Sequence, residues 1–478
     1  MRKITYLILL LFLLGILAAI PGASGFWFKK MYFDTIAAIN AGHQFNIEVL
    51  DYQEGWLHSS AKIKITPILP NPPPPIPIQL EVTIDQSITH GPLVYNDINK
   101  NWQFAAATIQ NDIHIPFVSQ NSMQIYSLAT FYDDWFTQIY IPAINKIIPG
   151  KGKITWQGLQ GEVDFHVTDQ TIDRTKMNMT IGAFNADTDP QIPVSFHMNI
   201  QPISYQTQAS RQFDNIWNGE TQSSLPGLSI QSAGKTIIDL NKLTMGCTFG
   251  AARDIFWNAN FQLSLDKLSA PDQPITVISP LTITSSINNF SAQGINEILK
   301  ALPNKPMAYQ VFPRIIIPTS VMNNTITLST SLGDLLLQAT FSWPANTPLP
   351  ASMDEITQKA NINMNVKIAI PLVNLLIDNY AKKIAARSAD KINAMVTERA
   401  TSPVPTPTLN QAPQQRIPTL EELQQHAVNN IKQQINNWIQ QGYITQENDS
   451  YIVSIIRDAG VLQINGKIPP PDFTPPPH

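Results

Sequence analysis

Residues 45–49 read Phe45-Asn46-Ile47-Glu48-Val49, a run in which apolar and polar side chains alternate. The same two-residue period returns in Ala61-Lys62-Ile63-Lys64-Ile65 and in Leu80-Glu81-Val82-Thr83-Ile84. A strand places successive side chains on opposite faces of its sheet. Such alternation therefore predicts antiparallel strands with one buried face and one face in water.

Strand-like patterns continue through most of the chain, without an alternating rhythm of strands and helices. The motif G-x-G-x-x-G is also absent, so the sequence argues against a doubly wound nucleotide-binding fold. We predict an α+β fold that is mainly antiparallel β, with a long curved sheet, a few helices and a preceding N-terminal transmembrane or signal helix. The further strand segments are 162–167, 194–200, 261–265, 325–330, 338–343 and 361–370.

Helical spacing of apolar residues is confined to a few segments. Pro142 is expected to kink or split one of these helices. Pro371 suits the first position of another, and the Thr419 hydroxyl suits the cap of the last. The predicted helices are 30–40, 133–148, 295–302, 371–398 and 419–441.

The first 30 residues have the pattern that the secretion machinery recognises. Met1-Arg2-Lys3 precedes an uncharged apolar run from Ile4 to Ile20, so we expect the rest of the chain to be exported. The small residues Gly22-Ala23-Ser24-Gly25 would suit a signal peptidase, whereas Ile4–Phe28 is long enough to cross a bilayer. We favour a retained anchor, because the aromatic and basic residues at 26–30 suit the membrane interface.

The composition limits the class of function. Charged residues make up only 14% of the chain and the net charge is −4, so no basic field is present to hold nucleic acid. Cys247 is the single cysteine, which excludes an internal disulfide. We expect Cys247 to be a small buried hydrophobe.

Proline-rich segments indicate how the chain is divided. Residues 70–77 are nearly continuous proline and predict an extended connector between two strands. We divide the chain into an anchor at 1–28, a β-rich extracytoplasmic body at 29–399, a proline-rich linker at 400–418, a C-terminal helix and β-hairpin at 419–467, and a proline-rich tail at 468–478.

Residue spacing reveals no catalytic or metal-binding pattern. The eight histidines are dispersed without H-x-x-x-H spacing, and the G-x-S-x-G turn of serine hydrolases is missing. We therefore predict no catalytic residues, no metal site and no cofactor, in a protein that is not an enzyme. One alternative stays open: His58 and His90 both follow early strands, and with an acid they would mark a hydrolase site.

Three short elements carry a resemblance to a known family. Tyr52-Gln53-Glu54-Gly55-Trp56-Leu57-His58-Ser59-Ser60-Ala61 joins the first two predicted strands, Ser87-Ile88-Thr89-His90-Gly91-Pro92-Leu93 follows the third, and Gly460 to Lys467 comes near the end. Behind an N-terminal anchor, this order resembles the YdgA-like family of bacterial envelope proteins, built around a domain of unknown function. Turn chemistry explains the residue types of these motifs, so we expect a structural role. The motif residues are Gly55, Trp56, Ser59, Ser60, His90, Gly91, Pro92, Asn465 and Gly466.

The resemblance implies a location and an architecture but no reaction. It implies an N-terminal helix in the bacterial inner membrane, with the main domain in the periplasm. From the anchor, the strands and the low charge, we expect binding of a lipid or other hydrophobic ligand on an apolar concave face, in maintenance of the cell envelope. The alternative is an envelope assembly or scaffold protein that contacts other proteins through its proline segments or strand edges.

Overall fold

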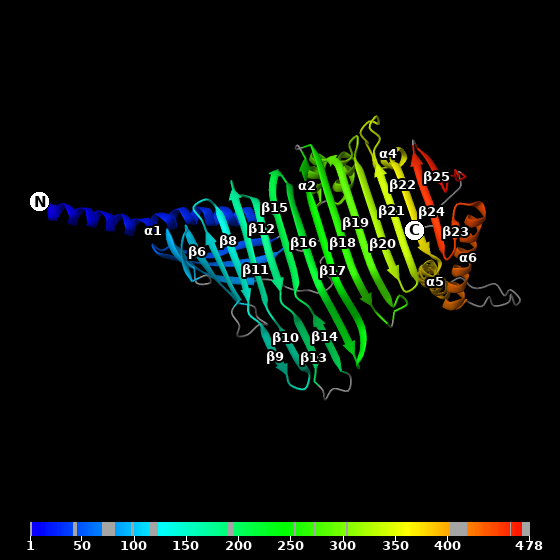
Figure 1. The fold of residues 1–478 in the computed structure, drawn as a ribbon, viewed down its shortest axis with the longest axis horizontal. Coiled ribbons are helices and arrows are strands. Elements are labelled where there is room, and N and C mark those ends of the chain that lie inside the picture. Colours follow the sequence, from blue (N-terminus) through cyan, green and yellow to red (C-terminus); the bar gives the residue numbers. More distant parts are fainter. Residues whose placement is uncertain are drawn as a thin grey trace. The chain divides into compact units, whose positions relative to one another are not determined.

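The computed structural model describes residues 2–41, 45–68, 82–96, 100–114, 123–189, 195–252, 255–271, 273–302, 305–401, 418–458 and 460–470 (Figure 1). The predicted connector at 70–77, nearly all of the predicted linker and most of the tail lie outside these residues. The chain forms two compact units, residues 1–263 with 291–308 and residues 264–290 with 309–478, and we describe each by itself. The fold is mainly antiparallel β with a few helices, as the sequence predicts.

The first unit opens with one long helix, α1 (Arg2–Ala41), into which the predicted anchor and the predicted short helix merge. Among the residues whose side chains are described, no helix has both the length and the apolar character needed to cross a bilayer. The strands that follow are β1 (Phe45–Gln53), β2 (His58–Pro67), β3 (Val82–His90), β4 (Leu93–Asn96), β5 (Asn101–Phe104), β6 (Ala107–His114), β7 (Met123–Ala129), β8 (Asp134–Ile141), β9 (Ile144–Ile148), β10 (Gly152–Trp156), β11 (Leu159–Thr168), β12 (Thr171–Ile181), β13 (Phe184–Thr188), β14 (Phe196–Ile200), β15 (Ile203–Phe213), β16 (Ile216–Ser232), β17 (Lys235–Ala252) and β18 (Phe256–Ser269). Two short helices, α2 (Ala292–Ala301) and α3 (Lys305–Val311), come later in the chain.

The sheet of the first unit curls around helix α1. Its strands pair in the order β1–β2–β3–β6–β7–β8–β11–β12. Helix α1 contacts the strands at both ends of this series as well as strands between them (Figure 1). Phe28, Met31 and Tyr32 of α1 are buried against the curled strands. The predicted curvature is present here, but α1 fills the inner side, so the expected apolar concave surface is not open at this point.

One chain of hydrogen bonds crosses this apolar core. Tyr32 Oη donates to Gln86 Oε1 at 2.5 Å, and Gln86 Nε2 donates to Asn111 Oδ1 at 2.6 Å. Asn111 Nδ2 then donates to the backbone oxygen of Ile125 at 2.9 Å. Burial raises the pKa of the Tyr32 phenol well above its usual range, so the phenol stays a donor. The chain fixes α1 relative to strands β3, β6 and β7.

Four long strands of the first unit's sheet, some of which belong to the curl, each bend at one point. Each is made of two successive elements, β8 with β9, β10 with β11, β12 with β13, and β14 with β15. The pairing register is unchanged across the bend, since β11 pairs with β12 and β10 with β13 in the same alignment. Strand β16 runs through the bend and pairs first with β15 and then with β14. Proline or glycine lies at the bend of every strand, a line that we call the crease: Pro142, Gly158, Gly182, Pro202 and Pro226.

The chemistry of these residue types explains the crease. Proline has no N–H to give to a sheet ladder, so it suits a point where pairing is interrupted. Gly158 has φ of +88°, and a Cβ there would collide with the backbone oxygen of Ile141. Hydrogen bonds from Gly182 N to Gly158 O (2.7 Å) and from Gln201 N to Gly227 O (2.9 Å) hold the strands together at the bend.

The prediction of a helix at 133–148 is wrong, because this segment forms β8 and β9. Trp135 is buried and stacks on Phe165 of β11, with ring centroids 5.8 Å apart, whereas the next residue, Phe136, is exposed. Aromatic and β-branched residues favour strands when neighbouring strands supply packing. Pro142, which was expected to split a helix, instead lies at the crease.

The second unit pairs its strands in the order β19–β20–β21–β22–β24, with β23 and β25 also beside β24. Helices α5 and α6 pack on each other through Ile377, Ala381, Ala427 and Val428. The helices predicted at 295–302, 371–398 and 419–441 are confirmed as α2, α5 and α6, and Thr419 forms a capping box with Glu422. The elements are β19 (Val277–Ser291), the 3₁₀ helix η1 (Phe312–Ile315), β20 (Val321–Thr330), β21 (Gly333–Ser342), α4 (Met353–Lys359), β22 (Asn361–Ala369), α5 (Ile370–Thr401), α6 (Leu420–Gln441), β23 (Thr445–Glu447), β24 (Ser450–Asp458) and β25 (Val461–Ile464).

The turn at Asn465-Gly466 is held by the Asn465 side chain. Its Oδ1 accepts from the backbone N of Ser454 at 2.6 Å, and its Nδ2 donates to the backbone oxygen of Tyr443 at 3.1 Å. Asn465 has φ of +47° and Gly466 has φ of +75°, the left-handed conformation that asparagine and glycine adopt most readily. These contacts join β24 to the segment that leaves α6, which is a structural role.

Asn465→Ala should lower the free energy of unfolding by about 2 kcal/mol, because it removes these hydrogen bonds and keeps a Cβ at positive φ. Asn465→Gly is the matched control: it removes the same hydrogen bonds but relieves the backbone, so it should destabilise less. Urea unfolding of the full chain, followed by circular dichroism, compares the two. Equal stability of Asn465→Ala and the unchanged chain would contradict the structural role.

Candidate functional site

The family motifs converge on helix α1. Gly55, Trp56 and Ser59 lie at the β1–β2 connection and the start of β2, and His90 ends β3. Gly91-Pro92 follows with a cis peptide bond. Ser60 is exposed and points away from this group, and Asn465-Gly466 belongs to the second unit. The structure therefore brings most, but not all, of the motif residues together.

Helix α1 meets these motifs with small residues. A Cβ on Gly22 would lie 2.7 Å from the Trp56 ring, and a Cβ on Gly25 would lie 3.0 Å from the His90 ring. Between them, Ser24 Oγ lies 2.9 Å from the backbone oxygen of Gly91. The segment that would suit a signal peptidase is thus a packing surface of the folded body.

His90 is a buried histidine with little scope for acid–base chemistry. It is 3% exposed, its Nε2 lies 2.8 Å from Ser59 Oγ, and the Phe28 ring packs beside it at 5.9 Å. Burial, and to a lesser degree the charge of His58, lowers the pKa of His90. The neutral imidazole is favoured, and its Nδ1 has no hydrogen-bond partner within the described residues.

His58 and His90 do not share a site. His58 is exposed and pairs across the sheet with Thr89, so it faces away from the buried His90. Within the described residues, no group of three or more histidine, cysteine or acidic side chains could hold a metal ion. Cys247 is half-buried on β17, and burial raises the pKa of its thiol, which disfavours a reactive thiolate.

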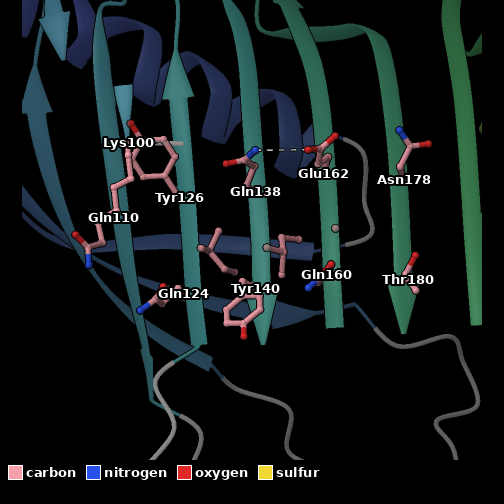
Figure 2. A pocket seen from close by; sticks show the side chains of 13 residues that line it. Lys100, Gln110, Gln124, Tyr126, Gln138, Tyr140, Gln160, Glu162, Asn178 and Thr180 are labelled. Carbon is pink, nitrogen blue, oxygen red and sulfur yellow. Dashed lines mark hydrogen bonds between the residues drawn. The ribbon is translucent and has the colours of Figure 1, made fainter. Parts of the chain in front are cut away.

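The outer face of the first unit's sheet, opposite α1, carries rows of polar side chains. Directly paired residues share a face, so strand pairing traces each row from β6 to β16. Figure 2 shows the side chains of these rows from β6 to β12 in front of the strands, with α1 behind. The amide row consists of Gln110, Tyr126, Gln138, Glu162, Asn178, Gln206 and Gln222. The hydroxyl row beside it, next to the crease, consists of Gln124, Tyr140, Gln160, Thr180, Ser204 and Ser224.

The members of these two rows on β6, β7, β8, β11 and β12 line a groove of about 700 Å³, which is within the range of ligand pockets. Gln138 Nε2 donates to Glu162 Oε1 across the strands at 3.5 Å, a long hydrogen bond (Figure 2). Gln138 Oε1 is buried, and no partner for it is found in the described part of the chain. Lys100, beside the β4–β5 hairpin, and Glu162 are the charged residues of the lining. We call this site the polar groove.

At the crease, the alternation of side chains is interrupted. Gln157 N donates to Ala183 O and Gly182 N donates to Gly158 O, so two successive residues of each strand face the same neighbouring strand. Trp156 and Phe184 therefore share the face of Leu159 and Ile181, which is the inner face of the sheet, and strand pairing continues this face to Leu228. Leu228 belongs to a row of six partly exposed apolar side chains, and a second row runs beside it. We call them the apolar rows: Ile144, Trp156, Phe184, Ile200, Leu228 and Leu240, then Ile154, Ala186, Met198, Ile230 and Ile238, with the exposed Lys146 at the edge of the second row.

Neither the polar groove nor the apolar rows were foreseen from the sequence. The strands themselves were partly predicted, but their register decides which side chains meet. One signal is present, a change in the phase of alternation: the apolar residues are Ile154 and Trp156 before Gly158, but Leu159 and Val163 after it. Similar changes occur near Gly182 and Pro202, at the other bends of the crease.

Residues 1–471 match the model of a family described as a bacterial protein of unknown function (DUF945). The chain belongs to the DUF945 family. No curated protein and no solved structure matches it. The description of DUF945 gives neither an activity nor a ligand. The narrower resemblance of this DUF945 protein to the YdgA-like proteins is based on its sequence motifs alone.

Gly25→Leu should destabilise this DUF945 protein by about 1–3 kcal/mol, because a larger side chain must displace the buried His90 ring. Ala23→Leu is the matched control, since Ala23 lies two residues away on the exposed side of the same helix. Thermal unfolding of the full chain in detergent measures both. Equal melting temperatures for the two variants would contradict the packing of α1 against β3.

Proposed function

We propose that this DUF945 protein is an envelope protein that binds the acyl chain of a lipid, or another apolar ligand, on its apolar rows. Its N-terminal segment would hold it at the bacterial inner membrane, with the main body in the periplasm. The observation that carries the proposal is the pair of apolar rows, partly exposed on one face of the first unit's sheet.

The size of the apolar rows suits an acyl chain. Six strands spaced about 4.8 Å apart give a row about 24 Å long. An extended acyl chain spans half of a hydrocarbon core, about 15 Å, so one row accommodates it. In the described part of the chain, strands β9, β10, β13 and β14 contact mainly other strands. Ligand burial would remove apolar surface that the fold leaves in water.

Two observations support the membrane location. Ile4 to Ile20 is an uncharged apolar run behind a basic start, and helix α1 continues from it without a break into the folded body. Peptidase cleavage between Gly22 and Gly25 would separate the helix from contacts with Trp56 and Gly91. Retention of the segment therefore preserves packing that the body uses.

We further propose a binding role rather than catalysis. His58 and His90, the residues of the hydrolase alternative, lie on different faces of the sheet. The polar groove is lined mainly by amide and hydroxyl groups, which donate and accept hydrogen bonds but do not titrate near neutral pH. Such groups select and orient a ligand.

The full chain isolated from bacterial membranes should keep its N-terminal segment. Intact-mass spectrometry should give the mass of the uncleaved chain, and washing the membranes with high salt or carbonate should not release it. A mature N-terminus between residues 22 and 26 would contradict retention, and would leave the ligand proposal to be judged by its own test.

Leu228→Gln combined with Ile200→Gln should weaken binding of a fluorescent fatty acid by about tenfold, because the ligand would lie on polar side chains. Ser229→Gln is the matched control, since Ser229 follows Leu228 on β16 and faces the other side. Mass spectrometry should also find lipid copurified with the unchanged protein and depleted from the double variant. Equal binding by all three proteins, or none by any, would overturn the proposal.

A further inference from the structure

We propose that the first unit docks on the surface of the bilayer that holds its N-terminal segment, through a group of exposed apolar side chains beside helix α1. This inference rests on the membrane location in the proposed function and adds a second, peripheral contact to it. It follows from the juxtaposition of these side chains with the end of the apolar run at Ile20.

Six large apolar side chains at this end of the first unit are each at least 62% exposed. Among the described residues of the unit, Ile147 is the one other large apolar side chain exposed to this degree. Single apolar side chains on a surface are ordinary, whereas a group of them marks a contact with a membrane or another protein. We call the group the rim: Phe26, Trp56, Leu93, Trp102, Phe104 and Tyr132.

Two contacts place the β1–β2 connection and the start of β4 beside α1. A Cβ on Gly22 would lie 2.7 Å from the Trp56 ring. Ser24 Oγ lies 2.9 Å from the backbone oxygen of Gly91, and Leu93 follows two residues later. The exposed parts of Trp56 and Leu93 therefore lie next to the helix where it enters the curl.

A series of aromatic rings brings β5 and the β7–β8 turn to the same place. The Trp27 ring of α1 packs on Phe131 with ring centroids 5.7 Å apart, and Phe131 packs on Phe104 with centroids 5.2 Å apart. Tyr132 follows Phe131 in the turn. The rim is thus drawn from several connections of the sheet, and these lie beside residues 22–27 of α1.

Backbone hydrogen bonds link these connections to one another. His90 N donates to the oxygen of Leu57 at 2.9 Å, and Gly91 N donates to the oxygen of Ala106 at 2.7 Å. Ala106 N in turn donates to the oxygen of Ala129 at 2.8 Å. The backbone that carries the rim is therefore fixed in the folded protein, so docking would not have to order it first.

The β4–β5 hairpin turns an apolar face to water. Leu93 pairs directly with Phe104, and both are exposed together with Trp102, whereas Val94 and Asn96 are buried on the other face. An antiparallel pair with one buried face usually exposes polar side chains on the other. The apolar outer face of this hairpin therefore indicates a partner other than water.

The position of the rim favours the bilayer as that partner. Helix α1 continues from the apolar run into the body, and its residues 22 and 27 lie about 3 Å and about 10 Å beyond Ile20 along the helix axis. The head-group layer on each side of a bilayer is about 5–8 Å thick. A bilayer that holds the apolar run would therefore place the rim at head-group level, where aromatic rings are stabilised.

A fluorescent label on the full chain reports contact with lipid. Cys247→Ser removes the single cysteine, so one new cysteine can carry the label. Leu93→Cys places the label on the rim, and Lys235→Cys places it on the exposed β16–β17 turn as the matched control. The chains are reconstituted into phosphatidylcholine vesicles that contain a phosphatidylcholine with a doxyl quencher on its acyl chain. Quenching should be about twofold at residue 93 and less than about a tenth at residue 235.

A second label position tests whether the rim binds the bilayer or merely lies near it. With the label on Tyr132→Cys, the pair Leu93→Ser and Trp102→Ser should reduce quenching by about half, because the hairpin would lose its apolar face. Ile147→Ser with Ile255→Ser is the matched control, since both are exposed apolar residues of the first unit outside the rim, and it should leave quenching unchanged. Circular dichroism melting curves identify any variant that fails to fold.

The outcomes distinguish docking from the proposed function. Equal quenching in the Leu93→Ser, Trp102→Ser variant and its parent would overturn docking, because the rim would then lie near the bilayer without binding it. Absence of quenching at both rim positions, in a chain that stays in the membrane and binds fatty acid, would overturn docking and keep the proposed function. A crosslink from residue 93 to a protein in intact cells would then assign the rim to a protein partner. Quenching at the rim without fatty-acid binding would keep docking and overturn the ligand.

Discussion

The close packing of α1 against strands β2 and β3 is the constraint on which the first unit depends. Gly22 and Gly25 let the helix approach the Trp56 and His90 rings, and any larger side chain would have to displace a ring. With the helix seated there, Phe28 and Tyr32 fill the inner side of the curl. The inner face of the curl is thereby occupied by the protein itself, and the same face continues beyond the crease as the apolar rows.

The crease keeps one face of the sheet apolar although the alternation in the sequence changes phase there. Before the crease the apolar residues include Trp156, and after it they include Leu159. Gln157 N donates to Ala183 O and Gly182 N donates to Gly158 O, so the backbone also shifts its alternation by one residue at the bend. The pairing register is unchanged, and the positive φ of Gly158 belongs to this local irregularity. The two shifts offset each other, and Trp156 and Phe184 lie on the same face as Leu159 and Ile181.

The sequence predicted the features that depend on the local spacing of apolar residues, and it missed the features that depend on how strands pair. Alternation identified strands such as β1, β2 and β22, and the Thr419 cap located the start of α6, because these signals are contained within a few residues. The segment 133–148 was misread, since its aromatic residues are consistent with either period until β7 and β11 are seen beside it. The polar groove is assembled from five strands, and no spacing within one strand reveals that Gln138 meets Glu162.

A retained anchor would place the ligand surfaces close to their source. The apolar run ends at Ile20, and Gly22 already contacts Trp56, so less than one helical turn would separate the bilayer from the folded body. The side chains at this junction suit an interface: Phe26 is 75% exposed and Trp56 is 62% exposed, an arrangement that water alone does not favour. Aromatic rings at the head-group level are stabilised there. A body held so close, on one continuous helix, would take an apolar ligand from the membrane without a long passage through water, in which an acyl chain is poorly soluble.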